Sequence, residues 1–255
     1  DGIQKAKVET LRSLELDDQL AEAYACLGRI AIFEWDLQRA RAECDMAIRL
    51  NPNLVEPVIL SAKALSYLSL HEEAIARVKQ AKRLDPVSPR TCMAAAVVYY
   101  IAGDYARAVE ESQQALELEP RHATAFYFMG LSQLRLGRAA DALKSLESAV
   151  AVGQRHAATL AGLAFVLAQT GHPDEAVHVL EEMRERATRA QVSPYYFAEV
   201  FVALHDVGKA LDYLSRSYDL HIPDMIGIGV DPLFESLHGH PAFERILSRL
   251  RVASE

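Results

Sequence analysis

The stretch ATAFYFMGLSQLRLGRAADALKSLESAVAVGQRH, residues 123–156, sets a pattern that returns along most of the chain. Small residues stand at its eighth and twentieth positions, Gly130 and Ala142. Larger apolar residues around them recur at spacings of three and four, which is the apolar stripe of an amphipathic helix. Because Gly137-Arg138 interrupts the stretch near its middle, we expect two helices in it.

Rows of this length, begun at residues 21, 55, 89, 123, 157 and 191, align without an insertion. The eighth and twentieth columns hold only Gly or Ala, and a larger side chain at a close contact would cost about 1–3 kcal/mol by overpacking. Each row is therefore expected to be a helical hairpin packed closely on its neighbours. The two columns are Gly28, Ala62, Ala96, Gly130, Ala164 and Ala198, and Ala40, Ala74, Ala108, Ala142, Ala176 and Ala210.

Proline ends the early rows, in Asn51-Pro52, Asp85-Pro86 and Glu119-Pro120, and a helix cannot continue through it. With the two small-residue columns, these rows resemble the tetratricopeptide repeat, which also has 34 residues. The resemblance implies an all-α fold, a right-handed α-solenoid of helix-turn-helix repeats. The expected repeats are 21–54, 55–88, 89–122, 123–156, 157–190 and 191–224, after the second helix of a truncated upstream repeat at 1–20.

The periodicity stops after the sixth row, and VDPLFESLHGHPAFERIL follows at residues 230–247. Asp231-Pro232 and His240-Pro241 are typical of helix starts. Since a solenoid needs a terminal piece with a polar outer face, we expect capping helices at 225–255. The motif also resembles the end of tetratricopeptide regions in bacterial regulators with a winged-helix or nucleotide-cyclase domain. That resemblance implies the C-terminal regulatory or sensor arm of a larger protein, of which this chain would be a fragment.

The composition narrows the class of partner. A net charge of −8 argues against direct binding of nucleic acid or of an anionic membrane, because both need clustered Lys and Arg. The three cysteines, Cys26, Cys44 and Cys92, lack CxxC spacing, which fits a reducing cytoplasm. The longest apolar runs are far shorter than the roughly 20 residues that cross a bilayer. We expect a cytoplasmic protein whose partner is a protein or peptide.

The sequence contains none of the common signatures of catalysis. There is no Gly-rich phosphate loop and no nucleophile placed beside a base. The closest histidine pair, His238 and His240, has no third ligand suited to a metal. We therefore expect no catalytic residue, no metal site, no cofactor and no enzymatic activity.

The tetratricopeptide resemblance implies that the first helix of each hairpin lines a concave groove. The side chains expected there are mainly aromatic and cationic, which suits an extended peptide or an amphipathic helix. The candidate partner-binding residues are Arg29, Phe33, Lys63, Tyr67, Arg90, Met93, Tyr100, Tyr127, Phe128, Leu131, Arg135, Phe165 and Tyr195.

Other interpretations of the groove stay open. Aromatic residues at helical spacing are more often core than site, so some of these rings could pack against a neighbouring repeat. The solenoid could serve homo-oligomeric assembly, including a homodimer, or it could sense a small ligand in a Tyr-rich pocket. Some tetratricopeptide adaptors clamp a carboxylate, but Ala25, Ile59 and Met93 stand where a Lys would be needed, and only Arg90 resembles a clamp cation.

Overall fold

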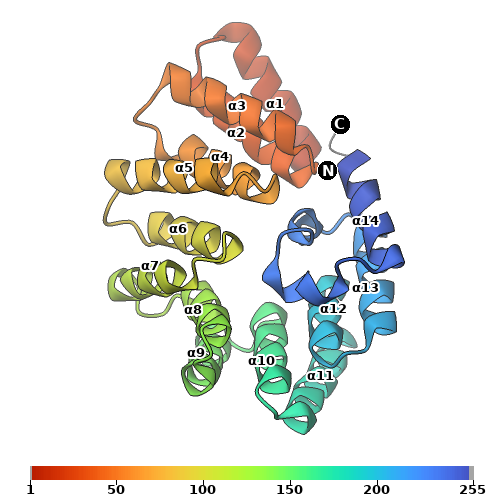
Figure 1. The fold of residues 1–255 in the computed structure, drawn as a ribbon. Coiled ribbons are helices and arrows are strands. Elements are labelled where there is room, and N and C mark those ends of the chain that lie inside the picture. Colours follow the sequence, from red (N-terminus) through yellow and green to blue (C-terminus); the bar gives the residue numbers. More distant parts are fainter. Residues whose placement is uncertain (1, 253–255) are drawn as a thin grey trace.

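The computed structural model describes residues 2–252, and every regular element among them is a helix. Most of the helices alternate in antiparallel pairs along a curved superhelix (Figure 1). The α-helices are α1 (Gly2–Leu16), α2 (Ala21–Phe33), α3 (Leu37–Leu50), α4 (Val55–Tyr67), α5 (His71–Leu84), α6 (Pro89–Ile101), α7 (Tyr105–Leu118), α8 (Ala123–Arg135), α9 (Ala139–Val152), α10 (Ala157–Gln169), α11 (Pro173–Ala187), α12 (Pro194–Ala203), α13 (Val207–Asp219) and α14 (Pro241–Val252). Two 3-10 helices, η1 (Pro223–Gly227) and η2 (Pro232–Leu237), precede α14.

The turn inside each hairpin has the same backbone conformation. One residue there takes a positive φ between 60° and 87°, the left-handed conformation that often ends a helix. Glycine, which adopts it without strain, supplies this residue in three hairpins, and other residues supply it in the rest. The positions recur every 34 residues: Trp35, Ser69, Gly103, Gly137, Gly171 and His205. The repeat register is thus visible in the backbone as well as in the sequence.

The small-residue columns lie where the two helices of a hairpin meet. Every alanine of the twentieth column is completely buried. A Cβ atom built on Gly130 would stand 1.8 Å from Leu146 Cδ2 and 3.1 Å from the Ala142 carbonyl oxygen. On Gly28 it would stand 2.5 Å from Cys44 Sγ. The predicted close approach of the helices, and with it the α-solenoid, is confirmed.

The superhelix curves until its last turn meets its first, so the chain forms a ring (Figure 1). The imidazole of His221, just after α13, stacks on the Trp35 indole at 3.7 Å between ring centroids. Its Nε2 lies 3.2 Å from the Phe33 carbonyl oxygen at the end of α2. These contacts join the first hairpin to the end of the sixth.

Residues 225–255, expected as capping helices, divide into two parts with different positions. Helix α14 packs on α13, where the Arg249 guanidinium lies 3.9 Å from the centroid of the Tyr218 ring. The two 3-10 helices instead lie inside the ring, on the concave side (Figure 1). We call residues 223–237 the inserted segment. Its side chains Met225, Ile228 and Phe234 are completely buried, so a large part of the hydrophobic core is formed inside the ring.

Candidate functional site

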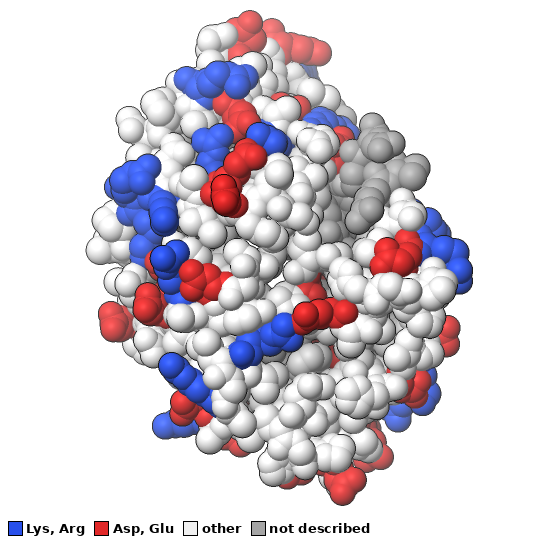
Figure 2. Space-filling view, viewed as in Figure 1, with Lys and Arg blue, Asp and Glu red and all other residues white. Residues whose placement is uncertain are grey.

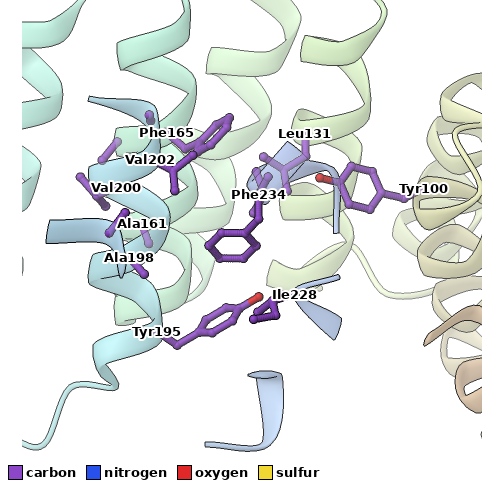
Figure 3. Packing of buried hydrophobic residues seen from close by; sticks show 14 of the residues in the cluster. Tyr100, Leu131, Ala161, Phe165, Tyr195, Ala198, Val200, Val202, Ile228 and Phe234 are labelled. Carbon is purple, nitrogen blue, oxygen red and sulfur yellow. The ribbon is translucent and has the colours of Figure 1, made fainter. Parts of the chain in front are cut away.

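The concave surface of the repeats is occupied by the inserted segment. The Tyr195 ring of α12 meets Phe234 edge to face, with 5.5 Å between centroids. The Tyr100 hydroxyl of α6 lies 3.5 Å from Asp231 Oδ1, and Arg135 forms an ion pair with Glu235. Figure 3 shows Phe234 and Ile228 at the Tyr195 ring, and the Tyr100 hydroxyl pointing toward them from α6. The repeats therefore hold a stretch of polypeptide, and it comes from the same chain.

A cavity of about 260 Å³ remains between the repeats and the inserted segment. Helices α4, α6, α8, α10 and α12 form one side of it, and the inserted segment forms the other. Its lining is aromatic and acidic, and none of its described lining residues is Lys or Arg. The lining includes Tyr67, Tyr100, Tyr127, Tyr195, Tyr196, Glu199, Asp224 and Asp231.

The carboxyl groups of the cavity are unusually hard to ionise. Burial raises the pKa of Asp231 to about 6, against the hydrogen bond from the Leu233 backbone N–H, which lowers it. Burial, reinforced by the charges of Asp231 and Asp224, holds the pKa of Glu199 well above its usual range. Glu199 is 3 % exposed, and its Oε2 accepts no hydrogen bond from any residue that the structure describes.

The concave surface near the N-terminus has a different character. Glu56 of α4 pairs with Arg29 of α2 and with Arg90 of α6, and both arginine side chains are more than half exposed. The Lys63 ammonium lies 5.7 Å from the Tyr67 ring centroid. Burial lowers the pKa of Lys63, and the charge of Asp224 opposes that shift. Here the two arginine side chains are open to solvent, whereas the ammonium end of Lys63 is partly desolvated.

The candidate groove residues thus fall into three groups. Five have exposed side chains: Arg29, Phe33, Lys63, Arg90 and Arg135. Six line the cavity: Tyr67, Tyr100, Tyr127, Phe128, Leu131 and Tyr195. Met93 and Phe165 are buried among repeat residues away from the cavity lining. For those two, the alternative interpretation as core residues describes their surroundings better.

Residues of the inserted segment were absent from the sequence-based site. Asp224, Gly227 and Asp231 line the cavity, but Asp224 is the last residue of the expected sixth repeat, and Gly227 and Asp231 were expected in the cap. The position of Glu199 in its row predicts a side chain that faces the groove. It was left out of the candidate binding residues because that set was mainly aromatic and cationic. A more informative signal was the spacing of apolar residues around Asp231-Pro232, since a short segment with several large apolar side chains needs a surface to cover.

Charges of both signs intermingle on the face of the ring seen in Figure 2, with broad uncharged areas between them. Within residues 2–252 no helix has both the length and the hydrophobicity to span a bilayer. Across the same described residues, no three His, Cys, Asp or Glu side chains converge as they would around a metal ion. His240 accepts a hydrogen bond from the Ala242 N–H at 3.2 Å, which is a helix-capping role.

Two models of known protein families match parts of this chain. A model described as "Tetratricopeptide repeat" matches residues 133–198. A second model, described as "Anaphase-promoting complex, cyclosome, subunit 3", matches residues 72–149. No curated protein has a significantly similar sequence.

Solved structures with a similar fold have low sequence identity. A tetratricopeptide repeat protein from Parabacteroides merdae has a TM-score of 0.67 and 13% identity, over 99% of this chain and 93% of that one. PilW, described as a widely conserved type IV pilus biogenesis factor, has a TM-score of 0.65 and 15% identity, over 74% and 88%. MamA from Desulfovibrio magneticus RS-1 has 0.56 and 16%, over 68% and 97%. At such identities the likeness concerns the fold.

Proposed function

We propose that this tetratricopeptide-repeat protein is a protein-interaction module whose concave surface binds a polypeptide segment of a partner in competition with its own residues 223–237. The observation that carries the proposal is the occupied groove. Rings from α6 and α12 already contact a short peptide-like stretch, through the edge-to-face packing of Phe234 and the Tyr100–Asp231 pair. A surface that fits one such segment is suited to another of similar chemistry, with an acidic residue before a short apolar helical turn.

Competition follows from the way the inserted segment is attached. A tethered segment rebinds at an effective concentration in the millimolar range. A partner must therefore bind the groove more tightly than the inserted segment does, unless the contacts of that segment are weakened first. The exposed Arg29 and Arg90 could make first contact with an acidic partner. The inserted segment would then act as a placeholder that sets the affinity threshold for the partner.

A peptide added in trans tests this competition. A fluorescein-labelled peptide of residues 222–240 is titrated into the wild-type chain and into Phe234→Ala, with anisotropy as the readout. We expect the variant to bind the peptide at least tenfold more tightly, because its own segment has lost its main anchor. A scrambled peptide is the control. Equal or absent binding in a variant that keeps its helical circular dichroism would refute the proposal.

A second variant covers the case in which Phe234→Ala fails to fold. Glu235→Arg places a like charge against Arg135 at an exposed position, so it weakens the inserted segment without opening the core. It should also raise peptide affinity over wild type. The same effect in Glu147→Arg, on the outer helix α9, would mean that net charge and not the segment is responsible.

We also propose that the chain is the regulatory arm of a larger bacterial protein. The residues that carry the resemblance to bacterial regulators, among them Asp231, Pro232 and Phe234, are the same ones that place the inserted segment in the groove. Displacement of the segment would be a natural signal to an attached output domain. The parent gene tests this idea directly: an upstream winged-helix or cyclase domain supports it, and a gene that encodes only repeats contradicts it.

A further inference from the structure

We propose that the cavity between the concave helices and residues 223–237 binds a small organic ammonium ion, held by Glu199 and surrounded by tyrosine rings. The inference extends the proposed function, since the ligand would lie between the groove and its occupant. Binding of this ligand does not require a partner protein, because the cavity is present while the inserted segment occupies the groove.

The first argument is the unpartnered acceptor. Glu199 projects from α12 into the cavity, is 3 % exposed, and leaves Oε2 without a hydrogen bond from any described residue. A buried acceptor without a partner is costly, and natural structures rarely keep one unless a ligand, ion or water satisfies it. An ammonium group would supply the missing positive charge or donor.

The second argument is the composition of the wall. Five tyrosines line the cavity, and an aromatic ring attracts a cation through its negative face. Carboxylates reach the same space from three elements: Glu199 from α12, Asp224 from η1 and Asp231 from the start of η2. Lys63 lies beside Tyr67 and interacts with Asp224, but it is not part of the cavity lining. The site thus gathers three carboxyl groups and has no Lys or Arg among its lining residues.

The third argument is size. A volume of about 260 Å³ lies just below the roughly 300 Å³ at which pockets begin to bury drug-sized ligands. It suits an alkylammonium or quaternary ammonium ion of a few carbons. Such a group could also be the lysine side chain of a peptide. We favour a free molecule, because Asp224, Gly227 and Asp231 of the inserted segment already form the side of the cavity that faces away from the repeats.

Binding should be linked to proton release. In the empty site the pKa of Glu199 is raised by burial and by Asp231 and Asp224, and a bound cation would lower it again. The other groups that face these carboxylates are five tyrosines, whose pKa values are raised and which stay neutral, and Lys63 beside Asp224. The tyrosines are Tyr67, Tyr100, Tyr127, Tyr195 and Tyr196. We therefore expect affinity to rise with pH between 5 and 8, with protons released on binding.

Calorimetric titration of the wild-type chain with choline tests the proposal, with 3,3-dimethylbutan-1-ol as the uncharged analogue of the same shape. We expect choline or 1,5-diaminopentane to bind at least tenfold more tightly than the alcohol. At least one of these two free cations should also bind as tightly as Nα-acetyl-lysine amide, which mimics the lysine of a peptide. If Nα-acetyl-lysine amide binds tenfold more tightly than both free cations, the ligand is a lysine side chain of a peptide and not a free molecule. Absence of binding by both cations at 10 mM, or equal binding of the alcohol, would overturn the site.

Variants separate the site from general charge. Glu199→Gln should weaken choline binding at least tenfold and remove its pH dependence, whereas Glu56→Gln, outside the cavity, should leave both unchanged. Should Glu199→Gln fail to fold, the partly exposed Tyr196→Leu replaces it, with the same expected loss of affinity. A full-affinity Glu199→Gln would contradict the assignment. Peptide competition is measured without ammonium, so either proposal can fail while the other stands.

Discussion

The concave side of the ring has two halves that share one backbone plan and differ in what covers them. In the N-terminal half, Arg29, Glu56 and Arg90 form ion pairs and the surface stays open. The other half is the part that the inserted segment covers, and there Tyr100, at the far end of the helix that carries Arg90, and Tyr195 are almost completely buried. Hairpin geometry is nearly constant along the solenoid, so the side chains of the first helices decide where a segment can dock. The repeat supplies the groove, and its composition selects the occupant.

The strongest test of this difference is to replace one phenylalanine in each half with alanine and to compare the losses in stability. Phe234→Ala should destabilise the chain by about 3–5 kcal/mol, since it empties a completely buried position. Phe33→Ala, at a residue that is 37 % exposed, should cost under about 1 kcal/mol. Urea denaturation followed by circular dichroism measures both. Equal costs would mean that the halves do not differ in packing.

A second test uses pH on the covered half. Because the pKa of Asp231 is raised to about 6 in the folded state, the folded chain keeps a proton there that the unfolded chain has lost. Its contribution to stability therefore falls as pH rises from about 4 to 6. Asp231→Asn should match wild type near pH 4 and exceed it by roughly 2–3 kcal/mol at pH 7, as denaturation at the two pH values would measure.

Asp206 provides a control of opposite sign. Hydrogen bonds from Lys209 lower the pKa of this carboxyl, so it stabilises the fold above the unfolded pKa and loses that effect as pH falls. Asp206→Asn should therefore be less stable than wild type at pH 7, and the difference should shrink toward pH 2, below the unfolded pKa. If both variants shift in the same direction, the burial of Asp231 is not the cause.

The third test asks whether the halves differ in the hairpins themselves. Gly130→Ala should destabilise by about 1–3 kcal/mol, because the new methyl group would overlap Leu146 and lie close to a backbone oxygen. Gly28→Ala should cost less, since the nearest atom is the sulfur of Cys44 at 2.5 Å, on a smaller side chain. Melting temperatures of the two variants provide the measurement. A larger loss at Gly28 would contradict this order.

The fold was predictable from sequence because each repeat enforces its own geometry. The size limit at Gly130 and Ala142 and the breaks at Gly137 and Pro120 act between residues that are close along the chain. Repetition of these local signals makes the helical hairpins easy to recognise, and the structure comparisons agree with the resulting fold.

The site was less predictable because it depends on contacts between distant residues. Tyr100 and Asp231 are 131 positions apart, and no periodic pattern relates them. The Tyr195 ring was assigned to the groove, but a pattern of helix faces cannot show that the groove is filled from within the chain. Glu199 gained its significance only when its surroundings were known, since a single acidic residue in a groove column has many roles.

The stacking of Trp35 on His221 closes the ring of helices, and this closure has a consequence for folding during translation. In a linear array of repeats each unit depends only on its neighbours, so one end can form without the other. Here the first hairpin leaves the ribosome long before its partner at residue 221, and the groove stays uncovered until residues 223–237 have been made, after the sixth hairpin. During that interval the tyrosines of the groove are exposed on the nascent chain. A partner present during synthesis would therefore bind the groove without competition from residues 223–237.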